Sequence, residues 1–393
     1  MSAALDALAR ELGEGALLRH APVDLDGVPL AATLTPGDGE ALAAAVRALR
    51  RAGLAAVPRG GGQHLWLGNP PARADVFLST QALRGVDAFE PAEGVCRAAA
   101  GATVSELRET VAAGGWELPL DAPAAATLGG ALASACIGPR SHGFGRARDA
   151  VLGLAVVLGS GERTRCGGRV VKNVTGYDLA KLYTGSLGSL CVIESAWLRL
   201  RPRPETTRVI ARRLDAGAAC AHALVAARRP SARACALVDG RELCVELAGD
   251  ARGVAEDAAA IGGDAQDAGR IDALAALQWE SGGIRFRIAA LPSELAAVHE
   301  PLLRAGARTL AYPGLDLVYA WGDPADADAL GHAVDDAARA ASGPVRCEVA
   351  PAHLKRRRDV FGASADEVLL VRALKQRFDP GGVLSPGRLA GCV

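Results

Sequence analysis

The sequence lacks several features that would indicate a particular class of function. Its 44 Lys and Arg residues balance 44 Asp and Glu residues, so no net electrostatic field would attract nucleic acid. Aromatic residues make up only 4% of the chain, which argues against a stacking platform for single-stranded nucleic acid. No apolar run is long enough to span a membrane, and the N-terminus lacks the basic and apolar regions of a signal peptide. The sequence therefore predicts a cytoplasmic protein, with peripheral docking at the inner membrane through a partner left open.

Metal-binding and nucleotide-binding motifs are also missing. Nine cysteines without a C-x-x-C pair argue against a disulfide framework and against zinc or iron–sulfur ligation. The seven histidines form no close pair at metal-ligand spacing, so no metal site is expected. No G-x-G-x-x-G follows a predicted strand and no G-x-x-x-x-G-K-[ST] occurs, so a nicotinamide Rossmann fold and a P-loop NTPase have little support.

What the chain does contain is a glycine-rich loop early in the sequence. Residues 58–63 read Pro-Arg-Gly-Gly-Gly-Gln and follow an apolar run, 54–57, that is typical of a short buried strand. Consecutive glycines let the backbone turn tightly and adopt positive φ without strain. Their amides can then converge on an anion such as a pyrophosphate, and Arg59 would add donors suited to phosphate. Taken alone, the same loop also fits an ordinary turn.

Three further glycine-rich segments follow, and their order is more specific than any one of them. They are ATLGGALAS at 126–134, KNVTGYD with GSLG at 172–188, and FDPGGVLSPGR at 378–388. Together with the first loop, they resemble the PCMH-type FAD-binding fold of the vanillyl-alcohol-oxidase superfamily. Within it, the chain is most similar to the family of FAD-binding subunits, of the E-subunit type, of bacterial glycolate oxidases (glycolate dehydrogenases).

The resemblance implies an α+β protein of two domains. The expected FAD-binding domain covers residues 1–204, and an α+β cap domain with an antiparallel sheet and helices covers 205–344. A C-terminal segment, 345–393, is expected to return to the FAD-binding domain. The alternation of strand and helix patterns along the chain is in keeping with this α+β class.

The resemblance also implies FAD as the cofactor and assigns residues to it. The amides of 60–63 would hold the pyrophosphate, and 127–130 with Ser134 would line the isoalloxazine and ribityl side. Val192 and Ile193 would offer main-chain groups to the adenine. The full set of expected cofactor-binding residues is Arg59, Gly60, Gly61, Gly62, Gln63, His64, Thr127, Leu128, Gly129, Gly130, Ser134, Gly138, Asp149, Lys172, Asn173, Gly176, Asp178, Val192, Ile193 and Arg388.

Two departures from the family pattern bear on how FAD is held. Many superfamily members bond the flavin covalently to a His four residues after the loop Arg, where this chain has Gln63 and places His64 one residue later. FAD is therefore expected to bind non-covalently. Near the C-terminus, Ser385 stands where the pattern has Asn, which leaves a hydrogen-bonding group but puts a flavin-tuning role in doubt.

No catalytic residue can be assigned from the sequence. Dehydrogenases of this family share a cap motif H-x-G-D-G-N and a later E-H pair, which by resemblance hold a metal and the catalytic base; neither occurs here. Oxidation of a 2-hydroxy acid requires a base for the hydroxyl proton and a cation for the carboxylate. Glu348, His353 and Arg357 are close in sequence but are expected at the surface, as is the basic run 355–358.

The resemblance implies a subunit of a multi-subunit enzyme that oxidises glycolate, a 2-hydroxy acid, to glyoxylate and passes electrons onward. Its expected partners are a homologous FAD-containing catalytic subunit and an iron–sulfur subunit. Two alternatives stay open. One is a self-sufficient FAD-dependent dehydrogenase of a D-lactate-like 2-hydroxy acid, and the other is a non-catalytic flavin subunit that relays electrons.

Overall fold

A computed structural model describes residues 2–13, 15–169, 177–280 and 282–393. The chain forms two compact units, which are described separately. The first unit comprises Met1–Cys136, Arg146–Pro202 and Ala363–Val393, and the second comprises Ile137–Gly145 and Arg203–Gly362. Within the described residues, no helix is long and apolar enough to cross a membrane.

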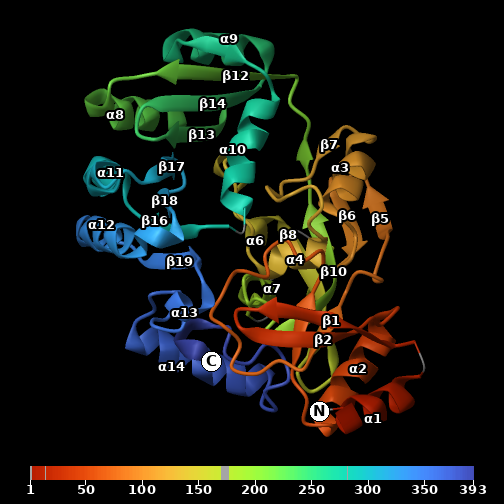
Figure 1. Ribbon diagram of the computed structural model, residues 1–393. Coiled ribbons are helices and arrows are strands. Elements are labelled where there is room, and N and C mark those ends of the chain that lie inside the picture. Colours follow the sequence, from red (N-terminus) through yellow and green to blue (C-terminus); the bar gives the residue numbers. More distant parts are fainter. Residues whose placement is uncertain (1, 14, 170–176, 281) are drawn as a thin grey trace. The chain divides into compact units, whose positions relative to one another are not determined.

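The first unit contains two main sheets (Figure 1). One sheet has four strands in the order β1 (Leu17–Leu25), β2 (Val28–Leu34), β4 (Val76–Ser79) and β3 (Ala56–Arg59). The strands β1 and β2 form an antiparallel hairpin, whereas β4 pairs with β2 and with β3 in parallel. The other is antiparallel, in the order β5 (Val86–Glu90), β6 (Val95–Ala99), β10 (Cys191–Arg199), β8 (Val151–Leu158) and β9 (Arg163–Gly167). A two-stranded ribbon pairs β7 (Trp116–Glu117) with β11 (Arg201–Pro202).

Helices of the first unit begin and end where capping side chains are available. Thr103 and Glu106 form a capping box at the start of α3 (Val104–Ala112), and Ser364 with Glu367 forms another at the start of α14 (Ala365–Phe378). The remaining helices are α1 (Ser2–Leu12), α2 (Gly39–Arg51), α4 (Leu128–Ala133), α6 (Ala147–Ala150), α7 (Leu179–Tyr183) and the short η3 (Ala390–Cys392).

The second unit is built on one antiparallel sheet of eight strands. Their order is β15 (Asp264–Gln266), β12 (Thr206–Arg213), β14 (Glu242–Gly249), β13 (Ala232–Val238), β17 (Arg308–Tyr312), β18 (Leu317–Gly322), β16 (Ile284–Ala289) and β19 (Val345–Val349). Residues 345–362 stay with this unit, because β19 pairs with β16. The sequence had placed the return of the chain to the first unit at residue 345, whereas the structure places it at Ala363.

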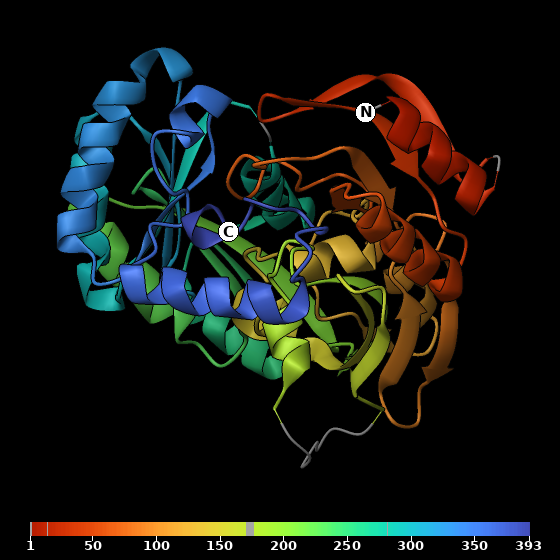
Figure 2. The same cartoon turned by 90° about the horizontal axis from the view of Figure 1, so that it is seen from below.

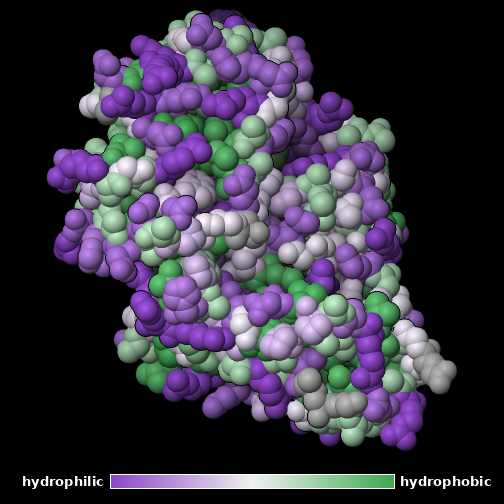
Figure 3. All heavy atoms as spheres, in the orientation of Figure 1, coloured by the Kyte–Doolittle hydropathy of each residue, from purple (hydrophilic) through white to green (hydrophobic). Residues whose placement is uncertain are grey.

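Helices cover both faces of the eight-stranded sheet. One face packs in an apolar core against α8 (Ala216–Ala227), α9 (Ala251–Ile261), α11 (Leu295–Arg304) and α12 (Ala327–Ala340), and α10 (Gly269–Trp279) covers the other (Figure 1). Hydrophilic side chains gather on the outer surface over α11 and α12 (Figure 3), as expected when the apolar side of each helix faces a sheet. Short helices complete the unit at α5 (Ser141–Phe144), α13 (Ala352–Lys355), η1 (Pro292–Glu294) and η2 (Pro324–Asp326).

Buried ion pairs anchor two parts of the second unit. Glu246 accepts hydrogen bonds from Arg140 Nε (2.8 Å) and Arg233 Nε (2.7 Å) and is 1% exposed. Burial would raise the pKa of Glu246, but the two guanidinium groups outweigh it, and the pKa is lowered. Arg140 also pairs with Asp272 of α10, so the segment Ile137–Gly145 is tied to both β14 and α10.

Two residues that the sequence placed at the surface are in fact buried. Glu348 lies within 3.3 Å of Arg285 Nε and within 3.2 Å of Arg287 Nη1, so β19 and β16 share a charged cluster. Lys355, the first residue of the basic run, is also buried, because α13 turns it inward, whereas His353 and Arg357 are exposed as expected.

His299 of α11 is a buried imidazole with no hydrogen-bond partner for either ring nitrogen among the described residues. Burial lowers its pKa from 6.5 to about 4, with the Asp239 carboxylate opposing the shift. Since the folded-state pKa lies below the unfolded value, the unfolded chain binds the extra proton first as the pH falls. The part of the stability of the second unit that depends on neutral His299 is therefore fully present above about pH 6.5. It is lost as the pH falls from about 6.5 to 4.

We predict that His299→Leu stabilises the second unit by about 1–3 kcal/mol at neutral pH, because it removes an unsatisfied buried polar ring. It should also remove much of the loss of stability between pH 6.5 and 4. Urea unfolding as a function of pH measures both effects, with His332→Leu on the exposed surface of α12 as the matched control. An unchanged pH dependence in His299→Leu would show that other groups are responsible.

Candidate cofactor-binding site

The predicted glycine loop directly follows β3 and forms one wall of a pocket in the first unit. A Cβ atom on Gly60 would lie 1.9 Å from Thr127 Oγ1, and one on Gly61 would lie 2.8 Å from Ala125 O. Gly62 has a φ of 78°, a conformation that side chains with a Cβ rarely adopt. The three glycines are thus required for two different reasons, close backbone approach at the first two and left-handed backbone at the third.

The loop leaves its amides unused. Within the part of the chain that the structure describes, the amide nitrogens of Gly60, Gly61, Gly62 and Gln63 donate no hydrogen bond. Unpaired amides at a turn of this kind form an anion-binding concavity. The pocket that they border is partly open to solvent.

Five parts of the chain, far apart in the sequence, line this pocket. Of the residues predicted from the sequence, the pocket brings together Arg59, Gly60, Gly61, Gly62, Gln63, His64, Thr127, Gly129, Gly130, Ser134, Val192, Ile193 and Arg388. Its walls therefore combine the loop after β3 and the start of β10, which belong to the two different sheets of the unit.

Other predicted residues lie elsewhere. Leu128 is fully buried in the core, Asp149 caps α6 by accepting from the Arg146 amide (2.9 Å), and Asp178 caps α7 and pairs with Lys181. Gly138 belongs to the second unit, where its amide donates to Ser141 Oγ. The predicted residues Lys172, Asn173 and Gly176 lie outside the described residues.

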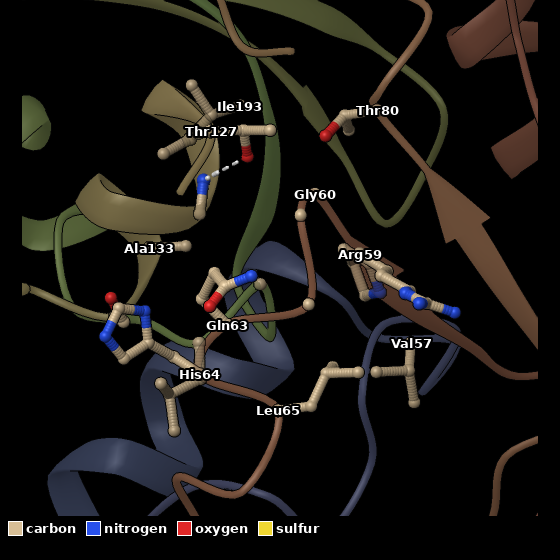
Figure 4. A pocket seen from close by; sticks show the side chains of 18 of the residues that line it. Val57, Arg59, Gly60, Gln63, His64, Leu65, Thr80, Thr127, Ala133 and Ile193 are labelled. Carbon is tan, nitrogen blue, oxygen red and sulfur yellow. Dashed lines mark hydrogen bonds between the residues drawn. The ribbon is translucent and has the colours of Figure 1, made fainter. Parts of the chain in front are cut away.

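The short helix α4 lines the pocket with Gly129, Gly130 and Ala133, and two of its amides are engaged within the protein. Its Gly129 amide donates to Ala100 O (2.8 Å), and its Gly130 amide donates to Thr127 Oγ1 (3.3 Å, Figure 4). A Cβ on Gly129 would lie 2.8 Å from Ala100 Cβ, so the small residues of this helix let it pack closely against Ala100. The amides of Gly129 and Gly130 are therefore engaged by the protein and are not offered to a ligand.

Arg59 and His64 lie on opposite sides of the glycine loop (Figure 4). Arg59 stacks over the Phe77 ring at 5.2 Å and passes beneath Gly62, and its Nε is buried without a hydrogen-bond partner in the described chain. His64 lies on the side that faces Thr127 and Ala133, and its Nε2 is 3.7 Å from Cys136 Sγ.

The C-terminal segment is bonded directly to the loop that follows the glycines. Arg388 is 3% exposed and donates through Nη2 to the carbonyl oxygens of Leu65 (2.7 Å) and Leu67. Asn69 donates from its side chain to Leu389 O (2.8 Å). Burial lowers the pKa of Arg388 to about 10, with the Asp26 carboxylate opposing the shift. The glycine loop is therefore held in place by residues more than three hundred positions away in the sequence.

Ser385 in the same segment is fully buried in the left-handed region, with a φ of 44°. Its amide donates to Ala56 O (2.8 Å), whereas its hydroxyl has no hydrogen-bond partner in the part of the chain described. Asn is common in this backbone region and Ser is not, so the Asn of the resembled pattern would fit this conformation better than the Ser found here.

Lys375 joins the C-terminal segment to β10. Its buried Nζ donates to Ser189 O (2.8 Å), Asp379 Oδ2 (2.7 Å) and Leu384 O. Burial lowers its pKa, and the Asp379 carboxylate opposes the shift. Ser189 lies between Gly188 and Cys191, and Leu384 precedes Arg388, so this ammonium fixes two segments that line the pocket.

The sequence did not reveal several residues of the pocket, among them Pro58, Thr80, Leu187, Gly188 and Cys191. Gly188 has a φ of 67°, and a Cβ there would lie 3.0 Å from Pro58 Cβ. The glycines of 185–188 were a visible signal for this contact. Thr80 follows β4, and its place beside the loop depends on the parallel pairing of β3 with β4, which no local pattern indicates.

We predict that Lys375→Met destabilises the first unit by about 3–5 kcal/mol, because it leaves the buried Asp379 carboxylate without its cation. The double variant Lys375→Met with Asp379→Asn should recover part of the loss, since no charge is then buried unpaired. Lys181→Met removes an exposed lysine that also pairs with an Asp and should change stability by less than about 1 kcal/mol. Urea unfolding compares the three variants, and a Lys375→Met protein as stable as the control would contradict this role.

Comparison with protein families identifies the first unit. Residues 30–167 match the family model described as FAD binding domain. The chain is 33% identical over 162 residues to glycolate oxidase subunit GlcE of Escherichia coli K12, covering 40% of this chain and 46% of that protein. It is 34% identical over 178 residues to bovine mitochondrial D-2-hydroxyglutarate dehydrogenase, covering 45% and 33% respectively. The chain thus matches less than half the length of these curated relatives.

Solved structures extend the likeness in fold to the whole chain. p-Cresol methylhydroxylase has a TM-score of 0.74 at 14% sequence identity, covering 99% of this chain and 97% of that one. Alkyldihydroxyacetonephosphate synthase has a TM-score of 0.70 at 13% identity, covering 98% and 85%. The predicted α+β class and PCMH-type fold are confirmed, and the chain carries an FAD-binding domain of this type, with FAD as its cofactor.

Proposed function

We propose that this chain is the FAD-binding subunit of a multi-subunit dehydrogenase that oxidises a 2-hydroxy acid, glycolate, to the corresponding 2-oxo acid, glyoxylate. The observation that carries the proposal is the set of four unpaired amides at 60–63, facing a pocket within an FAD-binding domain. The names of the relatives supply the substrate class, since they include a glycolate oxidase subunit and D-2-hydroxyglutarate dehydrogenases.

The residues of the pocket fit the chemistry of FAD. A pyrophosphate needs donors, which the four loop amides can supply, and Arg59 and Arg388, which also line the pocket, add positive charge beside them. Arg388 Nη1 lies 4.0 Å from Asp26 Oδ2, so its charge is only partly balanced. Bound FAD would supply the acceptor for the hydride that leaves the substrate carbon.

Different segments of the chain hold different parts of the cofactor. Amides 60–63 bind the pyrophosphate, and the side chains of Thr127 and Ser134 lie along the flavin side. Val192 and Ile193 offer main-chain groups at the start of β10, where the strand is paired with β8 and its other edge is not yet paired with β6. Leu128 lies in the core, and Asp149 and Asp178 cap helices. In this proposal none of the three contacts FAD.

Attachment of FAD is non-covalent in this proposal. His64 borders the pocket, but its Nε2 is directed at Cys136 Sγ, and Gln63 occupies the position of the usual linking His. Acid precipitation of the yellow protein should release intact FAD into the supernatant. Colour that stays in the pellet would refute non-covalent binding.

The role of the loop can be tested with Gly61→Ala, which places a Cβ 2.8 Å from the Ala125 carbonyl and displaces the loop. Hydrogen bonds to a charged phosphate contribute about 1.5–3 kcal/mol each, so loss of two should raise the Kd for FAD about a hundredfold or more. Gly37→Ala, where an added Cβ meets nothing within 4 Å, is the matched control. Equal FAD affinity in both variants would mean that the loop is only a turn.

In this proposal, other subunits supply the catalytic base and the electron acceptor. Among the described residues, no group of three His, Cys, Asp or Glu side chains gathers closely enough to hold a metal ion. The chain also lacks the cap motif that in similar proteins accompanies the catalytic base. The proposed partners are therefore a homologous flavoprotein that carries the base and an iron–sulfur protein that accepts the electrons. The relatives in Escherichia coli and Bacillus subtilis are themselves named as subunits, GlcE and GlcD.

The decisive assay gives the purified, FAD-loaded chain glycolate and D-lactate with a dye that accepts electrons. We expect no appreciable dye reduction by the chain alone, and activity when it is co-purified with its native partners. Robust turnover of D-lactate or glycolate by the single chain would replace this proposal with a self-sufficient dehydrogenase. A reconstituted complex whose activity is unaffected by Gly61→Ala would indicate that this FAD takes no part.

A further inference from the structure

One side of α14 carries an unpartnered stripe of side chains. Residues 366, 370, 373 and 377 recur at spacings of four, three and four, which places them on one narrow face of a helix with 3.6 residues per turn. All four are exposed, and the face lies opposite the buried Lys375. In Figure 2, α14 is the long deep-blue helix in the foreground.

The middle of the stripe is apolar and its ends carry opposite charges. Leu370 is 62% exposed, and the adjacent Leu369 is 61% exposed. Asp366 precedes Leu370 by one turn, and Arg377 follows Ala373 by one turn. Within the described part of the chain, neither Asp366 nor Arg377 takes part in an ion pair or a side-chain hydrogen bond. Single exposed leucines are ordinary, but two adjacent ones between unpaired opposite charges require a further explanation.

This stripe is complementary to itself when two copies lie antiparallel. If a two-fold axis passes between residues 371 and 372, Asp366 faces the second copy's Arg377, and Leu370 faces its Ala373. Each of these contacts then occurs twice, as an isologous interface requires. The spacing of four, three and four is also the spacing of a coiled-coil seam, in which apolar side chains of facing helices interlock.

We propose that α14 is a self-association surface whose occupant is a second copy of this chain. The self-complementary register favours a second copy over an unrelated protein, because an unrelated helix would need to carry the same pattern in reverse. A seam of this length buries less than the roughly 1,200 Å² of a standard interface, so the dimer should be reversible. Because its end contacts are exposed ion pairs, it should weaken as salt is raised.

The test uses the full-length, FAD-loaded chain in sedimentation experiments from about 1 to about 200 µM, where weak interfaces of this size are populated. We expect the average mass to rise from 40.1 kDa toward twice that value at low salt. Asp366→Arg and Arg377→Asp should each raise the dissociation constant at least about tenfold, since each places like charges opposite one another twice. Leu370→Glu should abolish dimerisation.

Mixing the two charge variants gives the sharpest outcome. An equimolar mixture of Asp366→Arg and Arg377→Asp should dimerise again, because unlike charges then face each other at both ends of a mixed pair. Val225→Glu is the matched control, since Val225 is 58% exposed on α8, which belongs to the other unit, and should leave the dissociation constant unchanged. Circular dichroism and FAD content confirm that each variant is folded.

Three results would overturn the proposal. They are a chain that stays monomeric at every concentration, a dimer that neither charge reversal weakens, and a mixture that dimerises no better than its components. Binding of the stripe to a different subunit in the absence of self-association would likewise reject a second copy as its occupant.

Discussion

The ammonium group of Lys375 is shared among oxygen acceptors that belong to two segments remote from each other in the sequence. One is the carbonyl of Ser189, two residues before β10, and the others come from the C-terminal segment. The Asp379 carboxylate, in turn, accepts from the amides of Val383 (3.0 Å) and Leu384 (2.8 Å). A Cβ on Gly159 would lie 2.1 Å from Asp379 Oδ1, so the turn beside it also has to be glycine. A buried ammonium group is costly unless it is paired and hydrogen-bonded. The need to keep all three acceptors around Lys375 Nζ therefore fixes the geometry of the surrounding chain.

That fixed geometry explains how the pocket keeps polar atoms unpaired. Unsatisfied amides and guanidinium nitrogens destabilise a folded chain unless water or a ligand reaches them. Here the glycine loop is pressed against Thr127 and Ala125 on one side and is held by Arg388 on the other. Neighbouring segments thus prevent the loop from turning its amides toward the protein. The amides of Gly129 and Gly130 in α4, by contrast, already donate to Ala100 O and Thr127 Oγ1.

Local patterns predicted much of the fold and a good part of the pocket. The pattern of Thr103 and Glu106 predicts the start of α3, because a capping box depends on residues a few positions apart. The box of Ser364 and Glu367 at the start of α14 was not predicted. The strands β1 and β2 were missed, since most of β1 is exposed and shows no alternation of apolar and polar residues. The glycine-rich segments predicted most of the pocket wall. They did not predict that Arg59 would stack on Phe77, or that Asp149 would cap α6, because these outcomes depend on contacts or backbone geometry that spacing does not encode.

The course of the chain through the second unit limits how such a protein can be rearranged. Ile137–Gly145 belongs to that unit, although both its flanking residues belong to the first. Arg140 in this segment is held by Glu246 and Asp272, which lie in the long insert Arg203–Gly362. A recombination event that exchanged only the long insert with a relative would separate Arg140 from both carboxylates. Functional divergence of this unit by module exchange would therefore need both segments to be exchanged together, whereas gradual substitution needs no such coordination.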